Sequence, residues 1–84
     1  MASKIEIVNE SLVVVQQYNL VTYLDELLYI RINSISSFYK RKLGVNDSIW
    51  QIRIYINCET YIYIKYDLES DAESDLKKLI SLIK

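Results

Sequence analysis

The chain of 84 residues has no histidine, no proline, one glycine and one cysteine, Cys58. Without histidine it lacks the commonest general base and the commonest zinc ligand, and one glycine cannot build a glycine-rich phosphate loop. Cys58 has no partner for an internal disulfide and no histidine to activate it as a nucleophile. We therefore expect a protein that is not an enzyme and that has no cofactor and no metal centre.

The net charge is also small, because ten Lys and Arg residues stand against eleven Asp and Glu residues and leave a formal charge of −1. No overall field draws the chain to nucleic acid or to an anionic membrane, so such binding would need a local patch. The longest aliphatic run, Leu12 to Val15, is too short to span a bilayer. With a single cysteine and no apolar leader in its first ten residues, the chain is expected to be cytoplasmic, without a membrane partner.

The chain has the length of one domain, which we divide into a strand region at residues 1–66 and a helix at residues 70–84. A first hairpin is predicted from Lys4–Val8 and Leu12–Gln17, because both are rich in β-branched residues and flank the turn-forming Asn9-Glu10-Ser11.

Leu20–Leu24 is predicted as a third strand, broken by Asp25-Glu26 and resumed at Leu28–Ile32. A helix over residues 20–32 remains the alternative, because four leucines in this stretch have helical spacing. Asn33-Ser34 then predicts a kink before another strand.

Residues 41–48 hold the only glycine beside Asn, Asp and Ser, and are predicted to be a loop. The two strands that follow alternate strictly. One face carries Trp50, Ile52, Ile54, Ile56, Ile62, Ile64 and Tyr66, and the other carries Gln51, Arg53, Tyr55, Asn57, Tyr61, Tyr63 and Lys65. A two-residue turn would pair Tyr55 with Ile62 and mix these faces, so we predict a three-residue or bulged turn with positive φ at Asn57.

The last segment is predicted to be an amphipathic helix whose apolar stripe is Ala72, Leu76, Leu79, Ile80 and Ile83. Ser70 followed by Glu73 has the capping-box spacing, and acids at a helix N-terminus are favoured by its dipole. Together these patterns predict an α+β fold: an antiparallel meander of five to seven strands packed by one C-terminal helix. Pleckstrin-homology-like domains share this element order.

The tyrosines on the polar side of the last two strands are the strongest functional signal. Three adjacent tyrosines approach the few hundred Å² at which an exposed patch marks an interaction site. We consider four explanations for this face: cover by another part of the chain, a homodimer interface, a site for another protein, or a site for a planar anionic ligand. The candidate residues are Arg53, Tyr55, Tyr61, Tyr63 and Lys65.

Lys40, Arg41 and Lys42 form the one basic cluster. Such a run is usually a solvated loop, but combined with stacked tyrosines it suits single-stranded nucleic acid or a nucleotide.

Residues 28–83 resemble short proteins of phages, prophages and archaeal viruses. The matching pieces are the strand Leu28–Ile32 with its Asn33-Ser34-Ile35 step, the hairpin Ile52–Ile62 and the helix opening Glu69–Glu73. The resemblance implies a mobile-element origin and carries no activity or site to transfer. We therefore expect a small interaction protein whose tyrosine side binds itself, as a homodimer or higher oligomer, or a host protein; the alternative is a nucleotide or single-stranded nucleic-acid binder.

Overall fold

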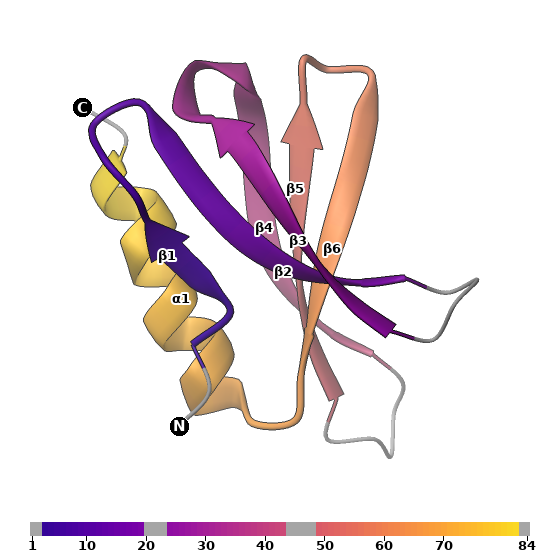
Figure 1. The fold of residues 1–84 in the computed structure, drawn as a ribbon. Helices are drawn as coiled ribbons and strands as arrows, with labels where there is room; N and C mark the ends of the chain where they lie inside the picture. The colour runs from indigo at the N-terminus through magenta and orange to yellow at the C-terminus, as the bar shows by residue number, and fades with distance from the viewer. Residues whose placement is uncertain (1–2, 20–23, 44–48, 83–84) are drawn as a thin grey trace.

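The computed structural model describes residues 3–19, 24–43 and 49–82, which form six strands, a short 3₁₀ turn and one α-helix (Figure 1). The elements are β1 (Ile5–Ile7), β2 (Leu12–Asn19), β3 (Leu24–Arg31), the 3₁₀ turn (Ile32–Ser34), β4 (Ile35–Leu43), β5 (Ile49–Ile56), β6 (Thr60–Tyr66) and α1 (Glu69–Leu82). The strands make two antiparallel sheets, ordered β1-β2-β3 and β4-β5-β6. The predicted α+β fold, a strand meander followed by a C-terminal helix, is confirmed, with six strands.

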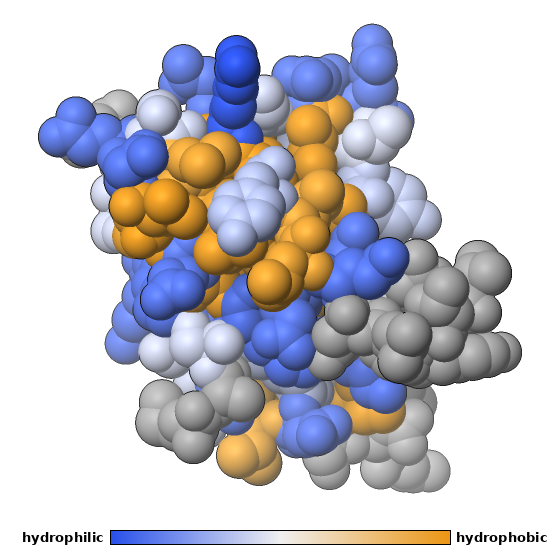
Figure 2. Space-filling model, in the orientation of Figure 1, coloured by the Kyte–Doolittle hydropathy of each residue, from blue (hydrophilic) through white to orange (hydrophobic). Residues whose placement is uncertain are grey.

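The first sheet begins with the predicted hairpin of β1 and β2. Asn9 closes its turn, because its side-chain oxygen accepts a hydrogen bond from the Ser11 backbone N–H at 2.8 Å. One face of this sheet contributes Val13 and Val15 to the core, where neither side chain is exposed. The other face looks outward, and Figure 2 shows apolar side chains gathered on it.

The segment for which both a strand and a helix were considered, residues 20–32, forms the strand β3 where the structure describes residues 24–31. β3 pairs with β2 from Leu24 to Arg31 without a break at Asp25-Glu26, which corrects the predicted interruption. The two acids lie where β2 and β3 continue past the three residues of β1, so this part of the ribbon has no third strand beside it. Glu26 is exposed there. Residues 20–23 of the predicted third strand lie outside the described residues.

The second sheet begins after the predicted kink, which the structure forms as the 3₁₀ turn Ile32–Ser34. β4 continues to Leu43, so the predicted loop does not begin at Arg41. The reason is pairing, since Arg41, Lys42 and Leu43 face Gln51, Trp50 and Ile49 across the ladder. Residues 44–48 of that loop lie outside the described residues.

The turn between β5 and β6 confirms the parity argument. Ile56 pairs with Thr60, which leaves a three-residue loop, and Tyr55 pairs with Tyr61. Asn57 has φ 54° as predicted, and Cys58 also has a positive φ, of 60°. The isoleucine and tyrosine sets therefore stay on opposite faces.

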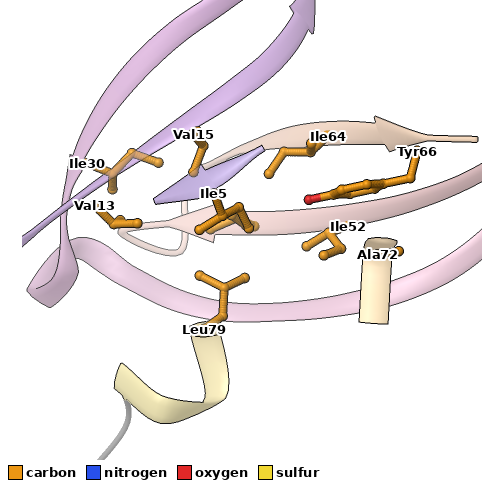
Figure 3. Packing of buried hydrophobic residues seen from close by; sticks show 10 residues of the cluster. Ile5, Val13, Val15, Ile30, Ile52, Ile64, Tyr66, Ala72 and Leu79 are labelled. Carbon is orange, nitrogen blue, oxygen red and sulfur yellow. The ribbon is translucent and has the colours of Figure 1, made fainter. Parts of the chain in front are cut away.

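The core lies between the two sheets and α1 (Figure 3). Ile5 sits at its centre, with Val13 and Ile30 of the first sheet on one side and Ile52 of the second sheet on the other. The complete cluster is Ile5, Val13, Val15, Ile30, Ile52, Ile54, Ile64, Tyr66, Ala72 and Leu79.

The helix begins at Glu69, so Ser70 lies in its first turn and not at the N-cap as predicted. Ala72 and Leu79 of the predicted stripe are buried, whereas Ile80 is 54% exposed. Within the described residues, no helix is long and apolar enough to cross a membrane.

Candidate interaction surface

The outward side of the second sheet holds the candidate residues in three cross-strand rows. Tyr55 pairs with Tyr61, Arg53 lies between Tyr39 and Tyr63, and Gln51 lies between Arg41 and Lys65. We call the surface formed by Tyr39, Arg41, Arg53, Tyr55, Tyr61, Tyr63 and Lys65 the tyrosine face. The structure thus brings the five hairpin candidates together and adds Tyr39 from β4.

Because the side chains of a strand alternate between its two faces, the residues on the side opposite the tyrosine face point into the core. Ile52, Ile54 and Ile64 on the reverse side are fully buried against the first sheet and α1. Among the described residues, none of the packed elements therefore covers the tyrosine face. Tyr61 is 49% exposed and Tyr39 is 39% exposed.

The tyrosine rings contact one another in a continuous ladder. Tyr39 stacks on Tyr55 with ring centroids 6.4 Å apart and planes 24° apart. Tyr55 and Tyr61 are 5.6 Å apart and tilted by 52°, and Tyr61 and Tyr63 are 6.4 Å apart and tilted by 30°. Offset and tilted contacts of this kind are favourable for aromatic rings and order the side chains before any partner binds.

Arg53 sits inside this ladder. Its guanidinium carbon lies 4.5 Å from the ring centroid of Tyr61 and 5.9 Å from that of Tyr39, which are cation–π distances. Hydrogen bonding to the Arg53 guanidinium lowers the pKa of the Tyr55 hydroxyl, and a hydrogen bond with Tyr39 acts in the same direction. The Arg53 side chain therefore helps to hold the rings of the tyrosine face in place.

Two buried polar atoms at the foot of the tyrosine face have no hydrogen-bond partner among the described residues. They are Oε1 of Gln51 and Nε of Arg53. Gln51 is only 6% exposed although it belongs to the outward side. These atoms at the base of the face are thus shielded from solvent.

The basic cluster does not act as one patch, because neighbouring residues of a strand point to opposite faces. Arg41 belongs to the tyrosine face, whereas Lys40 and Lys42 share the register of Ile52 and Trp50. Lys40 donates hydrogen bonds to Glu73 and, at 3.1 Å, to Glu69.

Lys40 is therefore a structural residue that fastens β4 to the first turns of α1. Its ammonium group also lies 5.2 Å from the centroid of the Trp50 ring. Hydrogen bonds to Glu73 and Glu69 raise the pKa of Lys40, and the bond from Lys40 lowers the pKa of Glu73. Lys42 is exposed on the same side.

Sequence reasoning missed a buried carboxylate on α1. Asp75 has no exposed surface and accepts hydrogen bonds from the Tyr66 hydroxyl at 2.7 Å, the Lys4 backbone N–H at 2.8 Å and the Ser3 hydroxyl at 2.8 Å. Burial, followed by the bond to Asp75, raises the pKa of Tyr66. The ammonium group of Lys78 lies 3.4 Å from Asp75 Oδ1.

A signal for this buried role was present in the sequence. Asp75 stands three residues after Ala72 and four before Leu79, on the apolar stripe of the helix. An acid in that position needs partners to be buried. Its partners tie the residues around β1 and the end of β6 to α1, which makes this network structural.

A cavity of about 490 Å³ lies beside the C-terminal half of α1 and is lined by Ile32, Asn33, Ile35, Ser36, Ser37, Phe38, Leu79 and Leu82. None of these described lining residues is charged. Within the described residues, no three His, Cys, Asp or Glu side chains are grouped as they would be to hold a metal ion.

Comparisons with protein-family models, curated proteins and solved structures found no match.

Proposed function

We propose that this protein is a non-catalytic interaction protein whose tyrosine face binds an acidic surface of a partner protein. The observation that carries the proposal is the composition of the face. Four tyrosines lie among Arg41, Arg53 and Lys65, and its described positions include no acid. Tyrosine and arginine are the residues enriched in the energetically important parts of protein interfaces.

The arrangement of the rings supports a protein partner more than a nucleic acid. Bases stack on open ring faces, whereas here Tyr55 stacks on Tyr39 and Arg53 lies over Tyr39 and Tyr61. Ring faces that are already used leave edges and hydroxyl groups for a partner, which suits hydrogen bonding to a protein. Lys40 and Lys42 share the opposite side of β4 from Arg41, so these three cations do not form one phosphate-binding cluster beside the tyrosines, which supports a protein partner.

The same charges argue that the partner is a different protein. A two-fold interface formed by this face alone would set the cations of one chain against those of the other, and like charges disfavour such contact. The resemblance to phage, prophage and archaeal-virus proteins favours a mobile-element origin. The partner would then be a host protein that presents carboxylates around an apolar spot.

The proposal is tested by replacing Tyr61 with the photo-crosslinking amino acid benzoylphenylalanine in cells that express the chain. Ile80 provides the matched control position, because it is similarly exposed, at 54% against 49%, but lies on α1. We expect a covalent adduct with one acidic protein from position 61 and none from position 80. Equal labelling from both positions would refute a site at the tyrosine face.

A second measurement tests the alternative function, which is binding of a nucleotide or single-stranded nucleic acid. Fluorescence anisotropy of a labelled thymidine oligonucleotide should show no saturable binding at physiological salt. Binding that saturates and weakens steeply with salt would mean phosphate contacts, and would move the proposal to single-stranded nucleic acid.

A further inference from the structure

β3 is an edge strand, because the first sheet has the order β1-β2-β3 and gives β3 no strand neighbour on its far side among the described residues. The direction of its backbone groups follows from two hydrogen bonds. Ile32 donates to Ser11 at 2.9 Å, and Gln16 donates to Lys4 at 2.8 Å, so odd-numbered residues of β2 bond to even-numbered residues of β3. The backbone groups of Leu27, Tyr29 and Arg31 therefore point to the open edge.

The side chains at this edge are unusually apolar for an exposed strand. Leu27 is 66% exposed and Tyr29 is 61% exposed, the highest values among the large hydrophobic side chains of the described residues. Both lie on the outer side of the first sheet, together with Val14. An edge that combines open hydrogen-bonding groups with apolar side chains is a site for pairing with another strand.

The sequence of β3 is complementary to itself when it is read in the antiparallel direction. A two-fold axis at Leu28 sets Leu27 of one chain opposite Tyr29 of the other, twice. The same register sets position 25, an aspartate, opposite Arg31, also twice. Aromatic–aliphatic and opposite-charge pairs are both stabilising across antiparallel strands.

Neighbouring registers lose this match. A shift of two residues in one direction sets Leu27 opposite Leu27 and position 25 opposite Tyr29. A shift in the other direction sets Tyr29 opposite Tyr29 and Leu27 opposite Arg31. Both shifts separate positions 25 and 31, so of these three registers the one centred on Leu28 matches the sequence of β3 best.

We propose that a second copy of this chain pairs with β3 along its open edge and joins the two first sheets into one six-stranded antiparallel sheet. This surface is separate from the tyrosine face, which belongs to the other sheet, so either proposal can fail alone. An edge contact of this kind is smaller than the roughly 1,200–2,000 Å² buried in standard interfaces. We therefore expect a dissociation constant in the micromolar range.

Sedimentation equilibrium of the full chain from about 1 to 500 μM, which brackets a micromolar constant, tests the proposal. The wild type should be dimeric at the upper end. Arg31→Asp and Asp25→Arg should each weaken the dimer about tenfold or more, because each creates two like-charge pairs. An equimolar mixture of the two variants should recover the dimer, because it pairs an acidic strand with a basic one.

Tyr29→Pro is a second, independent variant. The Tyr29 N–H points away from β2, so proline removes no bond of the existing ladder while it blocks the open edge. We expect a folded monomer by circular dichroism, and Tyr61→Ser on the tyrosine face should leave the dimer intact. A wild type that is monomeric at 500 μM, a dimer that survives Tyr29→Pro, or charge variants that do not recover on mixing would overturn the proposal.

Discussion

Replacing Tyr66 by phenylalanine tests whether the buried Asp75 network stabilises the fold. The substitution keeps the ring in the core and removes only the hydroxyl, which donates to Asp75 at 2.7 Å. Tyr66 is 2% exposed and Asp75 is not exposed at all, so water cannot readily replace the lost donor. A hydrogen bond to a charged group contributes about 1.5–3 kcal/mol, and we expect Tyr66→Phe to lower the free energy of unfolding by about 2 kcal/mol.

The loss is large for a domain of this size, whose total stability is on the order of 4–13 kcal/mol. Urea denaturation followed by far-ultraviolet circular dichroism measures it, with an unchanged denaturant dependence showing that the unfolding reaction is the same. Tyr61→Phe is the matched control, because the Tyr61 side chain is 49% exposed, and it should change stability by less than about 0.5 kcal/mol. A Tyr66→Phe cost as small as that of the control would refute the stabilising role of this bond.

Three further outcomes follow from the packing, the charges and the turn. Leu79→Ala should cost about 2–5 kcal/mol in a denaturation experiment, because Leu79 is 1% exposed, whereas Ile80→Ala should cost less than about 0.5 kcal/mol. Lys40 lowers the pKa of Glu73, so the stability that this pair contributes is present above the unfolded pKa of Glu and lost as the pH falls through the folded pKa; the stability gap between wild type and Lys40→Met should therefore shrink on acidification from pH 7. Cys58→Gly should raise stability by about 0.5–1 kcal/mol in urea, because glycine adopts the φ of 60° without the cost of a Cβ.

Alternation made the second hairpin predictable. Because side chains of a strand have a period of two, the isoleucines and tyrosines could be separated by face, and the turn length followed from keeping them apart. The structure places Asn57 at positive φ and pairs Tyr55 with Tyr61, as that argument requires. Local pattern was sufficient here because the two strands are adjacent in sequence.

The errors occurred where distant parts of the chain decide the outcome. Arg41 and Lys42 were assigned to a loop from composition, but pairing with β5 keeps them in β4. Asp75 was left out of the predicted buried stripe of the helix, although the hydroxyl of Tyr66 and the backbone of Lys4 make its burial favourable. Neither the ladder partner of a strand nor the partners of a buried carboxylate can be read from a local window.

The open edge of β3 was hidden for a related reason. In the sequence, Leu27 and Tyr29 belong to an ordinary apolar pattern. The sheet order is what shows that, among the described residues, β3 pairs with a strand on one side and has an open edge on the other. The tyrosine face and this edge belong to different sheets, so one chain could bind a second copy and a foreign protein at the same time.

The central claim, that the tyrosine face binds an acidic protein, is tested most directly by two charge reversals at neighbouring positions. Arg41 and Lys42 are adjacent in β4 but point to opposite faces, so Arg41→Glu and Lys42→Glu change the net charge equally. The measurement is the yield of the adduct formed from the photo-crosslinker at position 61. We predict that Arg41→Glu abolishes the adduct and that Lys42→Glu preserves it. Equal yields from the two variants would contradict the account.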